Sequence, residues 1–307
     1  MKRLLITFCS LMLAITVYAQ QTYPALIKVQ YNFIHVRDTT QRDKPYTETM
    51  MLLAGKEASY YTSFERIEGG VNNWLGFLES RKSGIQQANS AGISKDIYFG
   101  YFYLFAQQHK SIAYETFAIN YLVEDEMTDL NWKILKDTLN FSGIHTQKAT
   151  TTYKGRNWIA WFAPELPFAN GPWKLYGLPG LILEAYDDKN EVQFRFAGVE
   201  KVKPGDLAIS KAREFSPSLI KQIKGLDVSE IVMAAEGPIS NGGPVKISKS
   251  EFDKLKAQEE KDPVGFLTAQ YAAMGRKDPA LVAQAVVSGR GSGVVAAPTV
   301  AERLILK

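Results

Sequence analysis

Apolar and polar residues alternate along much of the chain up to Val199, which is the pattern of β-strands that bury one face. In the segment 25–36, for example, Ile27 and Val29 alternate with Lys28 and Gln30. Segments with the same strand character recur at short intervals. They predict strands over residues 25–36, 46–53, 58–64, 97–105, 112–123, 132–135, 146–153, 157–162, 181–186 and 192–199.

Short connections of turn-forming composition separate these segments. Lys154-Gly155 and Asp187–Asn190 predict hairpin turns, and Asp137–Gly143 is interpreted as a further turn. Short connections favour antiparallel neighbours, and an open twisted sheet of more than about 10 strands usually curls. The chain is therefore predicted to form a strongly curved antiparallel meander or an incomplete β-barrel.

The segment 97–105 carries aromatic residues on both of its faces, with Tyr101 on one and Phe102 on the other. Such a strand must be covered on both sides or must face a ligand. The segments 112–123 and 132–135 are expected to be its partners in the sheet.

Two segments predict helices. In residues 72–89, Trp74, Phe77 and Leu78 recur at helical spacing, and this helix is expected to pack on the concave side of the sheet. Ser248 followed three residues later by Glu251 has the pattern of a capping box before a helix over 248–260. The fold class is accordingly mainly β, of the α+β kind, with one or two packed helices and a flexible C-terminal tail.

The first residues have the features of a secretory signal peptide. Lys2 and Arg3 precede a largely apolar run, and Val17 and Ala19 supply the small residues that signal peptidase requires. The run is shorter than the roughly 20 residues that span a bilayer, so no transmembrane segment is expected after its removal. The sequence predicts an exported protein, in the periplasm or associated with the outer membrane.

The only cysteine, Cys9, lies within this signal segment, so the mature chain would contain none. That excludes disulfides, cysteine nucleophiles and cysteine-ligated metals. The predicted organisation is a signal peptide at 1–19, a curved β domain at 20–237, a linker and helical appendage at 238–275, and a flexible tail at 276–307.

Charge and motifs exclude several functional classes. The formal net charge of +4 is small and evenly interspersed, which argues against nucleic-acid binding. His35, His109 and His145 lie far apart without partners at zinc-ligand spacing, and no nucleophile elbow, phosphate-binding loop or dinucleotide fingerprint occurs. We therefore predict no catalytic residues, no metal and no cofactor, and expect a non-enzymatic protein.

Three tryptophans fall close together in the sequence, with cations beside them. Aromatic rings next to cations can form a platform for a sugar, a lipid headgroup or a peptide. The alternative interpretation is that these rings fill the core of the sheet. The candidate ligand-binding residues are Arg156, Trp158, Trp161, Trp173 and Lys174.

Arg156 follows a turn glycine and begins a strand that is otherwise rich in apolar residues. We expect a structural ion pair with Glu165, Glu184 or Asp187, with a role as a ligand anchor as the alternative.

A compact glycine–proline motif precedes the strand at 181–186. Pro179 and Gly180 suit the second and third positions of a type II turn over 178–181, and Gly177 would allow a close backbone approach. A role in binding, as a lip over a cavity, is the alternative. The motif consists of Gly177, Leu178, Pro179, Gly180, Leu181 and Ile182.

This hexamer completes a longer series of short elements in residues 147–182. The series is Gln147–Thr150, Gly155-Arg156, Ala160–Phe162, Glu165–Pro167, Gly171–Trp173 and the hexamer. In order and spacing it resembles the secreted bacterial GLPGLI family, which has no established activity. The resemblance implies partnership with an outer-membrane receptor. Many members carry a tyrosine–cysteine pair where this chain has His145-Thr146.

Three hypotheses about function follow. In the first, the curved sheet of an exported envelope protein binds an apolar ligand or a partner from the outer-membrane machinery. In the second, Arg156, Glu165 and Asp187 form the site of an envelope hydrolase or protease-related factor. In the third, the protein is a structural component of a surface assembly.

Overall fold

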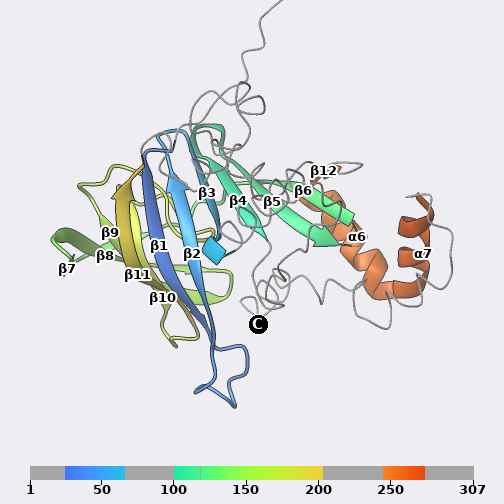
Figure 1. Ribbon diagram of the computed structural model, residues 1–307, viewed down its shortest axis with the longest axis horizontal. Helices are drawn as coiled ribbons and strands as arrows, with labels where there is room; N and C mark the ends of the chain where they lie inside the picture. The colour runs from blue at the N-terminus through green and yellow to red at the C-terminus, as the bar shows by residue number, and fades with distance from the viewer. Residues whose placement is uncertain (1–24, 66–99, 118, 203–244, 274–307) are drawn as a thin grey trace, which may run out of the picture.

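Twelve strands join into one open, curved sheet, with two helices beyond one of its edges (Figure 1). The computed structural model describes residues 25–65, 100–117, 119–202 and 245–273. The strands are β1 (Ile27–His35), β2 (Tyr46–Ala54), β3 (Ala58–Ser63), β4 (Tyr101–Phe105), β5 (Lys110–Phe117), β6 (Ile119–Glu126), β7 (Lys133–Phe141), β8 (Ile144–Tyr153), β9 (Arg156–Ala163), β10 (Leu181–Asp187), β11 (Val192–Lys201) and β12 (Val245–Ser248). The helices are the 3-10 turn η1 (Ala106–Gln108), α6 (Lys249–Lys261) and α7 (Pro263–Ala273).

The sheet contains two meanders, β1 to β6 and β7 to β11. The first strand of one meander, β1, pairs with the last strand of the other, β11. The strand order is β12-β6-β5-β4-β3-β2-β1-β11-β10-β9-β8-β7, and β1 pairs with β11 from Ile27↔Lys201 to His35↔Val192. All of these pairings are antiparallel except that β12 lies parallel to β6. The predicted mainly β fold with a curved sheet is confirmed, with the correction that the sheet is mixed rather than purely antiparallel.

A contact between distant strands shows how strongly the β7 end of the sheet curls. The rings of Phe141 on β7 and Phe196 on β11 lie 5.6 Å apart, although β8, β9 and β10 separate these strands in the sheet. Irregularities in β10 and β11, at Ile182/Glu184 and opposite Gln30/Tyr31, add local twist. This half of the sheet is therefore rolled like part of a barrel.

Three predictions about strands and turns differ from the structure. The segment 112–123 is not one strand, because β5 ends at Phe117 and β6 returns from Ile119 as its antiparallel partner. The turn predicted over Asp137–Gly143 is also wrong, because β7 continues to Phe141 and only Ser142-Gly143 turns the chain. The segment 132–135 belongs to β7, which pairs with β8 and not with β4.

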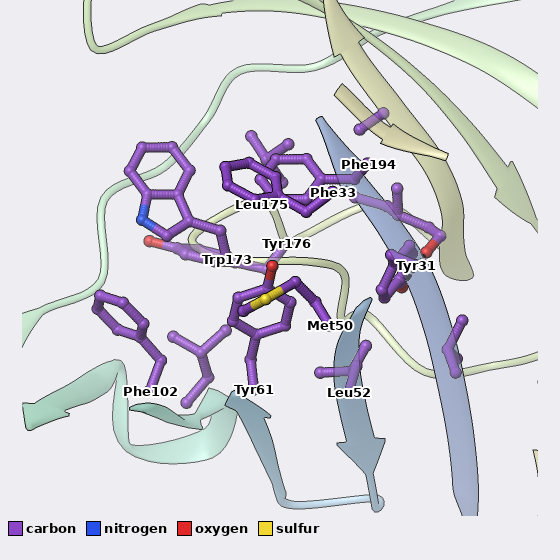
Figure 2. Packing of buried hydrophobic residues seen from close by; sticks show 14 of the residues in the cluster. Tyr31, Phe33, Met50, Leu52, Tyr61, Phe102, Trp173, Leu175, Tyr176 and Phe194 are labelled. Atoms are coloured by element: carbon purple, nitrogen blue, oxygen red, sulfur yellow. Dashed lines mark hydrogen bonds between the residues drawn. The ribbon is translucent and has the colours of Figure 1, made fainter. Parts of the chain in front are cut away.

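The core lies mainly on the concave face. Tyr31 and Phe33 of β1 and Phe194 of β11 point into it, and the connection between β9 and β10, residues 164–180, adds Trp173 and Leu175 (Figure 2). A smaller cluster on the opposite face contains Ala25, Met51, Leu53, Tyr60 and Tyr101.

The strand β4 contributes to both clusters. Tyr101 packs in the smaller cluster and Phe102 in the main core. The prediction of a strand covered on both sides is therefore confirmed for the described part of the segment 97–105.

The capping box at the start of α6 is present: Ser248 accepts a hydrogen bond from the Glu251 N–H, and the Glu251 side chain accepts one from the Ser248 N–H. The helix packs through Phe252 against Tyr121 of β6, with the rings 5.5 Å apart. Within the described ranges no helix is long and apolar enough to cross a membrane. The predicted signal peptide, the helix at 72–89, the linker up to residue 244 and the tail at 276–307 lie outside the described residues.

Candidate functional site

A cavity of about 440 Å³ lies beside the glycine–proline hexamer. Its lining combines residues from η1, the β6–β7 connection, the start of β7 and the β9–β10 connection. They are Ala106, His109, Met127, Asp129, Leu130, Asn131, Trp132, Ile134, Ala169, Tyr176, Gly177, Leu178 and Pro179. Three residues of the hexamer therefore line this cavity.

Backbone hydrogen bonds hold the β9–β10 connection in place across the concave face. The Gly177 N–H donates to the Ala169 carbonyl at 3.0 Å, and the Leu181 N–H donates to the Leu166 carbonyl at 2.9 Å. The Ile182 N–H donates to Asn170 at 3.0 Å. Leu175 and Leu178, which point inward, are fully buried. The cavity wall formed by the hexamer is thus anchored from both sides.

The turn within the hexamer differs from the predicted type II turn. The Gly180 N–H donates to the Leu178 carbonyl at 2.8 Å, which closes a three-residue turn around Pro179. The Leu181 N–H bonds outside the motif and so cannot close the four-residue turn.

The two glycines also exchange the roles predicted for them. A Cβ on Gly180 would overlap the Ala163 carbonyl, whose carbon would lie only 2.7 Å away. Gly177 instead has open space around it and adopts the left-handed conformation, with φ of +89°. Gly180 is therefore required for close approach, and Gly177 for its backbone angle.

Tyr176 ties the hexamer segment to the opposite wall of the cavity. Its hydroxyl accepts a hydrogen bond from the Thr128 N–H at 2.6 Å and donates one to the Thr128 carbonyl at 2.9 Å. The Trp132 indole N–H donates to the Tyr176 carbonyl at 2.7 Å. Burial raises the pKa of Tyr176, as do the charges of Asp129 and Asp125, against opposing effects of the Thr128 hydrogen bond and Lys174. Both aromatic side chains therefore use their polar atoms internally and offer the cavity apolar surfaces.

The remaining polar residues of the lining are His109, Asp129 and Asn131. His109 and Asn131 both adopt left-handed backbone conformations, each with φ of +48°, in the turns that carry them to the cavity. His109 and Asp129 are exposed, and neither side chain has a hydrogen-bond partner among the described residues. The site therefore combines apolar walls with an imidazole and a carboxylate available to a ligand.

The structure places the tryptophans singled out from the sequence away from this cavity. Trp158 and Trp173 are buried in the main core, where the Trp158 ring stacks on Phe194 at 6.1 Å. Trp161 faces the other side of the sheet, with the Lys148 ammonium 5.8 Å from its ring.

Lys174 lies over the ring of Phe102 at 4.7 Å. Trp158 and Trp173 lie close together, but the five candidate residues do not form one shared pocket among the described residues.

Arg156 lies in a buried ionic network with the end of β10. Its guanidinium pairs with Asp187, and its Nη1 lies 3.0 Å from Oε2 of Glu191. Asp187 is one of the three alternative partners expected from the sequence. The Asp187 carboxylate also accepts the Glu191 N–H at 2.7 Å and the Val192 N–H at 3.0 Å. Arg156 therefore stabilises the β10–β11 turn.

The other two predicted partners lie elsewhere. Glu165 is exposed in the connection after β9, and Glu184 pairs with Arg195 at 2.8 Å. The carboxylates of the hydrolase hypothesis, Glu165 and Asp187, are thus in different surroundings. Burial alone would raise the pKa of Glu191, but Arg156 and Arg42 outweigh it and hold that pKa below its usual value.

His35 is a buried titratable residue that the sequence did not single out as functional. It is 1% exposed, and within the described residues neither ring nitrogen has a hydrogen-bond partner. Burial lowers its pKa to about 4, and the positive charges of Arg37 and Arg156 act in the same direction. In the described part of the chain, no three His, Cys, Asp or Glu residues are grouped so as to hold a metal.

The residues that line the cavity were largely missed from the sequence. Trp132 and Ile134 were assigned only to a strand, and His109 was considered only as a zinc ligand. The signals available were the acidic run from Glu124 to Asp129 and the proximity of Trp132 to it, neither of which indicates a cavity by itself.

Comparison with known proteins gives a family match over part of the chain. A family model described as a protein of unknown function, Porph_ging, matches residues 104–184. This range includes all the residues that line the cavity and the whole hexamer. No curated protein matches the chain.

Two solved structures of PNGF-II, in different space groups, have a similar arrangement. Each shares 11% sequence identity with the chain and covers 75% of it, with TM-scores of 0.46 and 0.45. The chain spans 32% of the length of each PNGF-II chain. Over residues 104–184, which carry the cavity, the chain is thus similar to a family whose function is unknown.

Proposed function

We propose that this is an exported, non-enzymatic envelope protein that binds a small ligand with an apolar body in the cavity beside the hexamer. The observation that carries the proposal is the hollow of about 440 Å³ that Gly177, Leu178 and Pro179 help to line. This volume lies within the range of pockets that hold small molecules, roughly 300–1,000 Å³.

The composition of the walls supports a ligand with an apolar body. Met127, Trp132 and Pro179 give apolar surface, and the Tyr176 and Trp132 polar atoms are already bonded within the protein. Displacing water from such walls favours an apolar group, at about 25 cal/mol for each Å² that it covers. Orientation would come from the few polar groups of the lining.

Export is proposed from the signal-peptide pattern of residues 1–19, and partnership with an outer-membrane receptor from the resemblance to the GLPGLI family. Both are compatible with ligand binding, because a carrier in the envelope would deliver its ligand to such a receptor.

The test fills the cavity and measures binding of a neutral naphthyl dye by fluorescence. Ala106→Phe places a ring in the hollow, whereas Ala272→Phe adds the same ring at an exposed position of α7. Wild type and Ala272→Phe should bind the dye at one site, and Ala106→Phe should lose at least about tenfold in affinity, which corresponds to about 1.4 kcal/mol.

Circular dichroism and thermal unfolding would verify that both variants fold. Absence of binding by the wild type, or equal binding by a folded Ala106→Phe, would overturn the proposal.

A further inference from the structure

The charge distribution around the cavity allows the ligand class to be narrowed. Among the described residues that line it, Asp129 is the only acidic one, and no lysine or arginine contributes to the lining. Asp129 forms no ion pair within the described ranges. Its carboxylate is therefore available to a cation.

Two lysines associated with lining residues are engaged elsewhere. Lys174 lies over the Phe102 ring at 4.7 Å, and its charge acts to lower the pKa of Tyr176. Lys110, next to His109 in the chain, pairs with Glu124 at 2.7 Å. Neither neutralises Asp129 through a direct contact.

The aromatic walls also favour a cationic ligand. Trp132 and Tyr176 line the cavity together with Asp129, and their N–H and O–H groups are bonded to backbone atoms. A ring whose polar atom is already satisfied can still attract a cation through its face. An aromatic wall beside a carboxylate is therefore suited to an ammonium group.

The local sequence adds further negative potential. Asp125 and Glu126 end β6 immediately before the residues that line the cavity, whereas Glu124 is paired with Lys110. An anionic ligand would meet repulsion from this segment, whereas a cation would be attracted toward it.

We infer that the cavity selects a small organic ammonium ion, with an apolar body against Trp132 and Pro179 and its charged group at Asp129. This inference rests on the proposed binding function and specifies the ligand class for the same site. Ligand size is bounded by the hollow of about 440 Å³.

The test compares three probes that share one aromatic body: phenylethylamine, which is cationic, phenylethanol, which is neutral, and phenylpropionate, which is anionic. Binding to the mature chain would be measured by saturation-transfer NMR and calorimetry. The amine should bind about tenfold more tightly than the alcohol, because the carboxylate and the aromatic face both favour the ammonium group by comparable amounts. The anion should bind most weakly.

Asp129→Asn should reduce the difference between amine and alcohol from about tenfold to about threefold, because only the contribution of the aromatic face remains, and it should leave alcohol binding unchanged. Asp43→Asn, which changes an exposed aspartate in the β1–β2 connection, is the matched control and should keep the preference of the wild type.

The outcomes separate the two proposals. If none of the probes binds the wild type, the proposed binding function fails together with this inference. If the alcohol binds but the amine binds no more tightly, or if Asp129→Asn keeps the full preference for the amine, the ammonium inference is overturned and the apolar pocket stands.

Discussion

The hydroxyl of Tyr176 bonds to both backbone groups of Thr128, accepting from the N–H at 2.6 Å and donating to the carbonyl at 2.9 Å. One hydroxyl thus satisfies two backbone groups of the β6–β7 connection, which a neighbouring strand would otherwise bond. Because Tyr176 directly precedes the hexamer, this pair joins the two chain segments that enclose the cavity.

Tyr176→Phe should lower the free energy of unfolding by about 1 kcal/mol, since it removes the phenolic partner of two backbone groups. It should also weaken dye binding, because the two cavity walls lose their connection. Urea denaturation and dye titration measure the two effects. Tyr186→Phe, at a half-buried ring beside Arg195, is the control and should change neither; a fully stable Tyr176→Phe would contradict the prediction.

Gly180→Ala should destabilise the protein more than Gly177→Ala. The new methyl at position 180 meets the Ala163 carbonyl, so the backbone must move in a buried region. At position 177 the methyl has room, and only the left-handed backbone angle costs roughly 1–2 kcal/mol. Urea denaturation midpoints rank the two variants, and the reverse order would show that the close approach at Gly180 is not essential.

Arg156→Ala should cost about 3 kcal/mol of stability, because it leaves the Asp187 carboxylate buried without its cation. Arg42→Ala removes a half-exposed partner of Glu191 and should cost less than about 1 kcal/mol. Chemical denaturation compares them. Should Arg156→Ala retain the stability of the wild type, the alternative role of Arg156 as a ligand anchor would be favoured.

Stability should fall as the pH decreases below about 6.5, because His35 titrates differently in the two states. Its pKa is lowered from 6.5 to about 4 on folding, so the unfolded chain takes up a proton first. This part of the stability is fully present above the pKa that His35 has in the unfolded chain, and it is lost as the pH falls toward 4. Between pH 7 and pH 5 the loss amounts to about 2 kcal/mol.

His35→Phe should remove this part of the pH dependence. Above about pH 7, the free energies of unfolding of the variant and the wild type should change with pH in parallel. Urea denaturation at several pH values measures it. The pH interval just below 7 is diagnostic for His35, because the lowered pKa of Glu191 affects stability only at more acidic pH. An unchanged slope in the variant would assign the effect to other groups.

The sequence predicted the strands better than their ends, for reasons visible at particular residues. The residues from Ile112 to Val123 include no glycine, proline or asparagine–glycine pair, so no turn signal marks the reversal between Phe117 and Ile119. Conversely, Asp137 and Asn140 have turn-forming types yet lie in β7, an edge strand whose pairing is irregular. Ser142-Gly143, with two positive φ angles, carries the actual type I′ turn.

The site was harder to predict because it depends on contacts between distant segments. The hexamer was recognisable as a local turn, but its cavity requires His109 and Trp132, which the chain supplies from before and after β6. For Arg156 the sequence offered Glu165, Glu184 and Asp187 as alternative partners, and the structure selects Asp187.

The pairing of β1 with β11 also bears on how the chain acquires its structure. Residues Ile27–His35 find one of their two neighbours only in Val192–Lys201, so the middle of the sheet depends on contacts of very large sequence separation. Such long-range closure slows folding, since the entropy of bringing the ends together is lost before the pairing is gained. Until Lys201 has been synthesised, one edge of β1 has no native partner, and the nascent chain is most susceptible to intermolecular strand pairing at that edge.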